Sequence, residues 1–288
     1  MPSRRRAILV TGANGFVGRA LLKHLSASHD HVTATSRTKT SFDGATTIVG
    51  DLRKPTFCKK AVAEKDIIYY LAAARKNIAQ HTSRPFDFYR DNLEPLLTFL
   101  DALKACPPAI LVYVSSVLVG YVGQEGSNDG YLLGKYASEL ALQAFAKQYG
   151  WDVRIVRAAA VYGPGDRTEP ELATFIPSMI RKLKTDDTEL VIWGKGTRKL
   201  QFIFIDDLAA NLVAIGNGKK SGMFLVGNNE SASVNAIARM IMVQLGKKKT
   251  VRHDLTKPDK PSQLNRFENP VPMKTSLAQG LKKTIMHS

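Results

Sequence analysis

A glycine-rich turn near the start of the chain constrains its fold more than any other feature. Gly12, Gly15 and Gly18 stand three residues apart in the segment TGANGFVG. A short apolar run over residues 7–11 precedes the turn, and apolar residues at helical spacing follow it over residues 16–25. Such a strand, turn and helix open a βαβ unit, in which the amides at the helix N-terminus favour a negatively charged group.

The spacing predicts that this turn holds the pyrophosphate of a dinucleotide. Gly12 permits the tight turn, Gly15 lets the backbone approach the pyrophosphate, and Gly18 lets the helix pack close to the sheet. The alternative is a glycine turn without a ligand, and the position at the head of a βαβ series argues against it. The cofactor contacts expected in this segment are Gly12, Asn14, Gly15, Phe16, Val17 and Gly18.

Strand and helix patterns alternate through the first half of the chain. This alternation predicts an α/β fold, a Rossmann-type doubly wound parallel sheet. Besides the first strand and helix, we expect strands over residues 31–36, 46–49, 67–71, 110–115 and 152–158, and helices over residues 86–105 and 131–149.

Beyond residue 162 the pattern loosens into a loop, GPGDRTEP, and shorter elements. We expect a dinucleotide-binding domain over residues 1–160 and a smaller C-terminal α/β substrate lobe over residues 161–288, partly interleaved with the first. The elements expected in this lobe are helices over residues 172–183, from 206, 233–245 and 276–286, and strands over residues 190–193, 202–205 and 223–226.

The composition argues against several classes of protein. With 44% hydrophobic and 23% charged residues in a length of 288, the chain resembles an ordinary globular protein. No apolar run approaches the ~18 residues of a membrane span, and the run over residues 7–10 is too short for a signal peptide. Cys58 and Cys106 form neither a disulfide framework nor a metal-ligand pattern, which favours a reducing cytoplasm and no bound metal.

The net charge of +16 is spread along the chain. Its short clusters, at residues 4–6 and 247–249, form no aromatic-interleaved basic stripe and no recognisable nucleic-acid module. A surplus of cations also attracts small polyanions such as dinucleotides and sugar nucleotides, or it merely solvates the surface. We therefore expect small-molecule partners rather than nucleic acid or a membrane.

The end of the second predicted strand indicates which dinucleotide binds. An acidic residue there would bind the ribose 2′-hydroxyl of NAD, whereas an arginine accommodates the 2′-phosphate of NADP. The sequence has Ser36, Arg37 and Thr38 at this point and no acidic residue before Asp43. Arg37 therefore favours NADP(H), with NAD(H) as the alternative cofactor and a solvated surface arginine as the alternative role.

A serine pair, a tyrosine and a lysine lie where an open α/β sheet gathers its chemistry. Ser115 and Ser116 end the fifth predicted strand, and Tyr131 and Lys135 are one turn apart on the next helix. A neighbouring ammonium and an oxidised nicotinamide would lower the tyrosine pKa from about 10. Tyr131 would exchange a proton with a substrate hydroxyl or carbonyl, Ser116 would hydrogen-bond the same oxygen, and Lys135 would bind the nicotinamide ribose. The alternative needs no ligand: the two serines only form a turn at the end of the strand, and Tyr131 is only an aromatic residue at the start of the helix.

Together these residues resemble the extended short-chain dehydrogenase/reductase family, the NAD(P)-dependent epimerase/dehydratase group, over almost the whole chain. The matching segments are TGANGFVG, GDL at Gly50–Leu52, YYLAAA at Tyr69–Ala74, Asn92, YVSSVLVGY, YLLGKYASE with Glu139, RAAAVYGPG at Arg157–Gly165, FIFIDDLA at Phe202–Ala209 and SLAQGLKKTI. The resemblance implies that Asp51, with Leu52 beside it, meets the adenine. It places further cofactor contacts at Leu71, Ala72, Ala73 and Asn92, and it implies a homodimer formed through the helices near residues 86–105 and 131–149.

The serine pair is one departure from the family pattern. Counting from the strand selects Ser116 as the catalytic serine, whereas counting back from Gly120 selects Ser115. We choose Ser116. Only fourteen residues separate Ser116 from Tyr131, which implies a trimmed substrate loop.

The segment before the FIFIDD-like strand is a second departure. Family members that bind nucleotide diphosphates often carry an arginine there, where this chain has Leu200 and Gln201, with Arg198 and Lys199 upstream. The substrate contacts that we expect are Ser115, Ser116 and Arg198.

Four hypotheses of function follow from the resemblance. Arg37 favours an NADP-dependent reductase of a 4-keto sugar nucleotide, since NADPH usually serves as a dissociable reductant. A nucleotide-sugar 4-epimerase that retains its NAD(P) is the first rival, because the same serine, tyrosine and lysine serve both reactions. A reductase of a non-sugar carbonyl compound and a non-catalytic dinucleotide-binding protein are the others. Val117 and Leu118 argue against a 4,6-dehydratase, which needs an acidic pair at this place.

Overall fold

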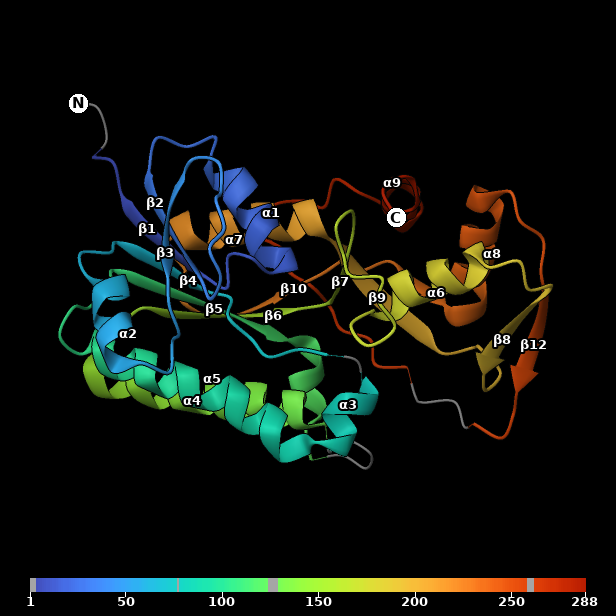
Figure 1. The fold of residues 1–288 in the computed structure, drawn as a ribbon, viewed down its shortest axis with the longest axis horizontal. Coiled ribbons are helices and arrows are strands. Elements are labelled where there is room, and N and C mark those ends of the chain that lie inside the picture. Colours follow the sequence, from blue (N-terminus) through green and yellow to red (C-terminus); the bar gives the residue numbers. More distant parts are fainter. Residues whose placement is uncertain (1–3, 77, 124–128, 258–261) are drawn as a thin grey trace.

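The structure is a computed structural model that describes residues 4–76, 78–123, 129–257 and 262–288. A sheet of seven strands, parallel at every pairing, runs through its larger part in the order β10-β6-β5-β4-β1-β2-β3 (Figure 1). The order reverses beside β1, which confirms the predicted doubly wound sheet. The strands are β1 (Ala7–Thr11), β2 (His31–Ser36), β3 (Ala45–Val49), β4 (Ile67–Tyr70), β5 (Ile110–Ser116), β6 (Val153–Ala158) and β10 (Gly222–Val226).

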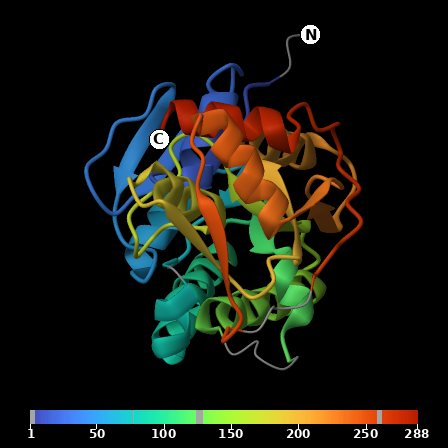
Figure 2. The same ribbon diagram turned by 90° about the vertical axis from the view of Figure 1, so that its right-hand side faces the viewer.

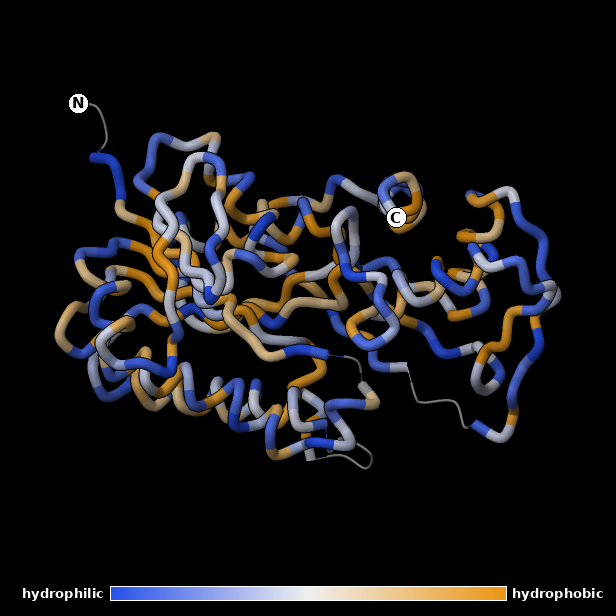
Figure 3. The backbone as a smooth tube through the Cα atoms, viewed as in Figure 1, coloured by the Kyte–Doolittle hydropathy of each residue, from blue (hydrophilic) through white to orange (hydrophobic). Residues whose placement is uncertain are grey.

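Helices cover both faces of this sheet, with α1 and α7 on one side and α2, α4 and α5 on the other (Figure 1). β1 is apolar on both faces because Ile8 and Val10 enter the core beneath α1, while Leu9 enters the core beneath α4. The backbone colouring in Figure 3 shows this apolar centre along the strands. The helices are α1 (Phe16–Leu25), α2 (Pro55–Val62), α4 (Pro85–Leu103), α5 (Gly130–Tyr149) and α7 (Ile205–Asn217).

The smaller lobe is built from two short sheets and three helices around a core of its own (Figure 2). β9 pairs with β7 in parallel and with β11 in antiparallel orientation, and β8 pairs in parallel with β12. The C-terminal half also supplies β10 and α7 to the large sheet. The elements of the lobe are β7 (Ala160–Tyr162), β8 (Glu189–Trp193), β9 (Lys199–Phe204), β11 (Ser231–Ser233), β12 (Thr250–Asp254), α6 (Phe175–Lys184), α8 (Val234–Leu245) and α9 (Leu277–Met286).

The structure contains several elements that the sequence patterns do not predict. The missed elements are α2, α3 (Ile78–Ser83), the 3-10 helix η1 (Val117–Tyr121), β7, β11 and β12. They are short, so few residues are available to show a period. Within the described parts of the chain, no helix is both long and apolar enough to cross a membrane.

Candidate active site

The glycine-rich turn joins β1 to α1 at the carboxyl edge of the large sheet. Gly12 has a φ of +65°, which favours glycine, and a Cβ atom there would lie 2.7 Å from the backbone nitrogen of Ala72. A Cβ atom on Gly18 would lie 2.8 Å from the Cα atom of Ala13. The turn therefore has no room for side chains at these positions. Among the described residues no side chain caps α1 and its first turn has no acidic residue, an arrangement that suits an anion.

The other residues of the turn have different surroundings. Asn14 accepts hydrogen bonds from the Arg19 guanidinium, through its backbone oxygen at 3.3 Å and through its side-chain oxygen. Phe16 and Val17 pack against the core of the smaller lobe. Their side chains thus connect the turn to that lobe.

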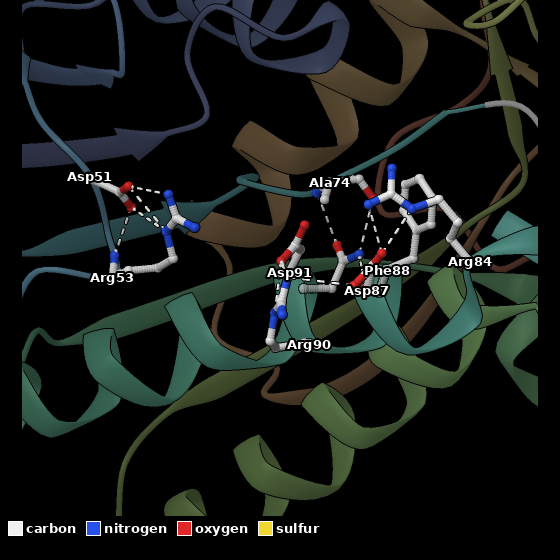
Figure 4. A network of polar contacts seen from close by, with 9 residues as sticks. Asp51, Arg53, Ala74, Arg84, Asp87, Phe88, Arg90 and Asp91 are labelled. Atoms are coloured by element: carbon white, nitrogen blue, oxygen red, sulfur yellow. Dashed lines mark hydrogen bonds and ion pairs between the residues drawn. The ribbon is translucent and has the colours of Figure 1, made fainter. Parts of the chain in front are cut away.

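The loop after β4, which carries Leu71, Ala72 and Ala73, is tied to the glycine turn. Thr11 Oγ1 accepts the backbone N–H groups of Leu71 at 3.1 Å and Ala72 at 3.3 Å. From the other side, the buried Asn92 side chain clamps Ala74, which donates to its Oδ1 at 3.1 Å and accepts from its Nδ2 at 3.0 Å (Figure 4). Asn92 therefore positions the loop that lies beside the predicted cofactor.

The adenine end of the predicted site contains an arginine that the sequence argument missed. Arg53 grips the Asp51 carboxylate, with Nη2–Oδ2 at 2.6 Å and Nε–Oδ2 at 3.0 Å (Figure 4). These hydrogen bonds lower the pKa of Asp51, and the charge of Arg37 lowers it further. Leu52 is buried beside this pair, and Arg37 is exposed directly after β2. The sequence does offer a signal for this ion pair, because the aspartate stands only two residues before the arginine. Elsewhere in Figure 4, Arg84 and Arg90 pair with aspartates on the surface of α4.

The two serines at the end of β5 have different partners. Ser115 is buried, and its hydroxyl donates to Glu139 Oε1 at 2.5 Å. Glu139 also receives Arg157 Nη2 at 2.6 Å, so the hydroxyl of Ser115 belongs to an internal ion-pair network. Ser116 is half-buried at the strand end, and its Oγ accepts the Leu118 N–H at 3.2 Å. This geometry favours Ser116 over Ser115 as the serine that reaches a substrate.

Tyr131 and Lys135 lie on the first turns of α5, next to the end of β5. Lys135 is buried, donates to the Val114 carbonyl at 2.8 Å, and lies 5.9 Å from the centroid of the Tyr131 ring. Burial lowers the pKa of Lys135 to about 7, although the nearby Glu139 carboxylate opposes this.

The sequence predicts that Lys135 and an oxidised nicotinamide together lower the pKa of Tyr131, and the contribution of Lys135 is not seen. Burial raises the pKa of Tyr131, and the cation that opposes the rise is Arg75, which follows the loop after β4. The physical reason is that Lys135 is itself desolvated and directed at a carbonyl oxygen. Arg75 could have been found as the basic residue directly after YYLAAA.

Lys135 is expected to give the protein a specific pH dependence of stability. Its pKa is about 7 when folded against an ordinary value of 10.5, so between these values the unfolded chain binds more protons and stability rises with pH. From pH 7 to pH 9 this contributes about 2 kcal/mol to the free energy of unfolding. Urea unfolding at both pH values should show this gain in the wild type and in the exposed-site control Lys39→Met, and its loss in Lys135→Met. Identical pH dependence in all three proteins would contradict the prediction.

Two further residues near Tyr131 were missed. Asp129 caps α5, since its Oδ1 accepts the N–H groups of Tyr131 at 2.8 Å and Leu132 at 3.2 Å. A capping aspartate just before a helical pattern was a readable signal. His81 lies on α3 with its ring stacked on Tyr131, and no periodicity indicates so short a helix.

The structure places Arg198 just before β9, where its backbone oxygen accepts the Val234 N–H at 3.1 Å. Gln201, one of the two residues at the place where the family pattern often has an arginine, binds the returning C-terminal chain. Its Oε1 accepts the Asn265 N–H at 2.7 Å and its Nε2 donates to the Asn265 carbonyl at 3.0 Å. The side chain of Gln201 thus has a partner within the smaller lobe.

The fold and this constellation define a Rossmann-type enzyme that works with a dinucleotide. Residues 8–227 match the model of the NAD dependent epimerase/dehydratase family, and the chain belongs to this family. It is therefore an NAD(P)-dependent enzyme, as its sequence predicts.

Relatives of known activity match most of the chain. The dTDP-4-dehydro-6-deoxy-D-allose reductase of Streptomyces bikiniensis is 28% identical in an alignment of 280 positions that covers 88% of this chain and 85% of the relative. The GDP-L-fucose synthase of Escherichia coli (strain K12) is 23% identical over 285 residues, covering 88% and 86%.

Solved structures share the fold. The UDP-N-acetylglucosamine 4-epimerase of Methanobrevibacter ruminantium M1, in complex with UDP-N-acetylmuramic acid, superposes with a TM-score of 0.86 at 21% identity, covering 99% of this chain and 98% of the other. MoeE5 in complex with UDP-glucose and NAD superposes with a TM-score of 0.84 at 24% identity, covering 97% of both chains.

Proposed function

We propose that this chain is an NADPH-dependent reductase of a nucleotide-activated 4-keto sugar. The observation that carries the proposal is the site at the carboxyl edge of the sheet. Ser116 lies there at the end of β5, and Tyr131 and Lys135 lie at the start of α5. Among relatives with similar sequences, one is named as a reductase of a dTDP-linked 4-dehydro-6-deoxy sugar.

The residues at the sheet edge fit a dinucleotide. Gly12 and Gly18 keep their positions in the turn free of side chains at the N-terminus of α1, where backbone amides would stabilise a pyrophosphate. Arg37 is exposed directly after β2, which supports a cofactor that carries a 2′-phosphate. When bound, NADPH supplies a hydride to the carbonyl carbon of the substrate.

The protonated form of Tyr131 fits the role of the acid in a reduction. Burial raises the pKa of this phenol, so it carries its proton at neutral pH and can donate it to the carbonyl oxygen of a substrate. Ser116 hydrogen-bonds the same oxygen, and Lys135 holds the ribose of the cofactor.

The reaction itself distinguishes the hypotheses. Purified protein is mixed with NADPH and either a dTDP-linked or a GDP-linked 4-dehydro-6-deoxyhexose, and absorbance at the nicotinamide band is followed. One equivalent of NADPH oxidised per sugar reduced is the expected result. Interconversion of UDP-glucose and its 4-epimer without net oxidation would overturn the reductase in favour of an epimerase. Reduction of non-sugar ketones only would identify the third hypothesis.

The preference for NADP(H) is a proposal that rests on Arg37. A charge-assisted hydrogen bond contributes about 1.5–3 kcal/mol, so Arg37→Ala should weaken NADPH binding about 10- to 100-fold and leave NADH binding unchanged. Fluorescence titration of both cofactors measures this, and Lys39→Ala, an exposed cation of the same loop, is the matched control. Equal or tighter binding of NADH by the wild type would refute the preference.

We also propose a homodimer formed through α4 and α5. Both helices expose large apolar side chains: Phe86 and Leu97 on α4 are 68% and 45% exposed, and Tyr136 and Leu140 on α5 are 39% and 48% exposed. Sedimentation equilibrium, which reports the mass in solution, tests this assembly. A cytoplasmic location agrees with Cys58 and Cys106, which are both free thiols.

A further inference from the structure

An imidazole lies face to face with the ring of Tyr131. The centroids of His81 and Tyr131 are 5.1 Å apart and their planes differ by 15°. Phe88 of α4 meets the same imidazole edge-on, at 4.6 Å and 69°. His81 is only 4% exposed and lies between two half-buried rings, so α3, α4 and α5 each contribute one ring to a single aromatic cluster.

Both ring nitrogens of His81 have a partner. Nε2 lies 2.9 Å from the backbone nitrogen of Lys76, whose N–H group can only donate, so Nε2 is the acceptor and carries no proton. Nδ1 therefore carries the proton of the neutral ring, and it lies 3.3 Å from Asp129 Oδ2. These two hydrogen bonds fix the tautomer and the orientation of the imidazole.

Asp129 joins this imidazole to the backbone of Tyr131. Its Oδ1 accepts the Tyr131 N–H at 2.8 Å, while its Oδ2 faces His81. One carboxylate thus fixes both the start of α5 and the ring that is packed on the phenol. The Tyr131 ring is therefore packed against the His81 imidazole, and the Nζ atom of Lys135 lies 5.9 Å from the centroid of the tyrosine ring.

We propose that His81, anchored by Asp129 and the Lys76 amide, is a positioning residue that holds the Tyr131 phenol in line for proton transfer. The proposal rests on the proposed function, in which Tyr131 is the acid. Proton transfer requires the donor within hydrogen-bond reach of the substrate oxygen, and small displacements of a reacting group cost large factors in rate. Stacking on a fixed ring restricts the rotation of Tyr131 about its side-chain bonds, which its backbone cap alone does not do.

Kinetics of two His81 variants test the proposal. With NADPH and the dTDP-linked 4-dehydro-6-deoxyhexose, His81→Ala should lower kcat about 10- to 100-fold with KM and NADPH affinity within about threefold of the wild type. His81→Phe retains a ring for stacking and should recover most of this loss. The control is His253→Ala, an exposed histidine on β12 that contacts Asn235, and it should behave as wild type. Unchanged kcat in His81→Ala, or a loss expressed in KM or cofactor affinity, overturns the proposal.

A readout that does not depend on turnover separates this proposal from the proposed function. Crystal structures grown with NADP⁺ should show the Tyr131 ring rotated or spread over several orientations in His81→Ala, and restored in His81→Phe. A Tyr131 ring in its wild-type orientation in His81→Ala would refute the positioning role. If the ring moves but Tyr131→Phe still reduces the sugar at the wild-type rate, the acid role of Tyr131 fails while the positioning of its ring stands.

Discussion

Replacement of Tyr131 by phenylalanine is expected to lower kcat about 10³-fold while leaving NADPH affinity within a factor of about two. The change removes one hydroxyl group and keeps the ring that stacks on His81, so α5 and the loop after β4 should be undisturbed. The loss follows because the phenol is the proposed proton donor and phenylalanine has no proton to give. Steady-state NADPH oxidation and a parallel fluorescence titration measure the two quantities.

The matched control for this prediction lies on the same helix. Tyr136→Phe removes the same hydroxyl from a side chain that is 39% exposed, and it should retain wild-type kcat. Undiminished turnover by Tyr131→Phe would refute the assigned role of the phenol, and equal losses in both variants would indicate a general effect on α5.

The second large effect concerns stability. Glu139 is 1% exposed and its partner Arg157 is 20% exposed, with Nη2–Oε2 at 2.6 Å. Glu139→Gln leaves a largely buried guanidinium without its counter-charge and should lower the free energy of unfolding by about 3 kcal/mol. Urea denaturation measures this change against the wild type.

An exposed ion pair provides the comparison. Asp101 on α4 is 71% exposed, and its partner Lys104, directly after α4, is 47% exposed. Asp101→Asn should therefore lower the free energy of unfolding by at most about 0.5 kcal/mol. Similar small losses at both sites would show that the internal network of Glu139 contributes little. The double variant Glu139→Gln with Arg157→Gln should be less destabilised than the sum of the single variants, because the two groups interact directly.

Regular elements with strong periodicity were predictable from the sequence. The first helix, at residues 16–25, and the second strand, at residues 31–36, have the predicted bounds because their apolar spacing and flanking glycine or polar residues mark both ends. α3 and β7 could not be found in this way, since six and three residues do not establish a period. The predicted helix over residues 172–183 begins only at Phe175, because residues 169–173 form a turn closed by Glu169.

Some residues of the candidate site could likewise be predicted from the sequence, and others could not. Gly12, Tyr131 and Lys135 were recognisable because each stands at a fixed place on a predicted element. His81 was not, because its role depends on a contact across the fold, a ring stacked on a residue of another helix. Arg53 was overlooked although its partner Asp51 lies only two residues before it. The direction of the Tyr131 pKa was also beyond the sequence, since burial of both the phenol and Lys135 decides it.

The return of the chain to the large sheet has a consequence for how the protein is made. β10, at residues 222–226, pairs with β6, and α7 covers one face of the same sheet. The pairing joins segments more than sixty residues apart, as Arg154 and Gly222 show, so its closure carries the entropy of a long loop. During synthesis, β6 therefore has no β10 partner until most of the chain has left the ribosome. Neither half of this enzyme can therefore be exchanged as a separate module.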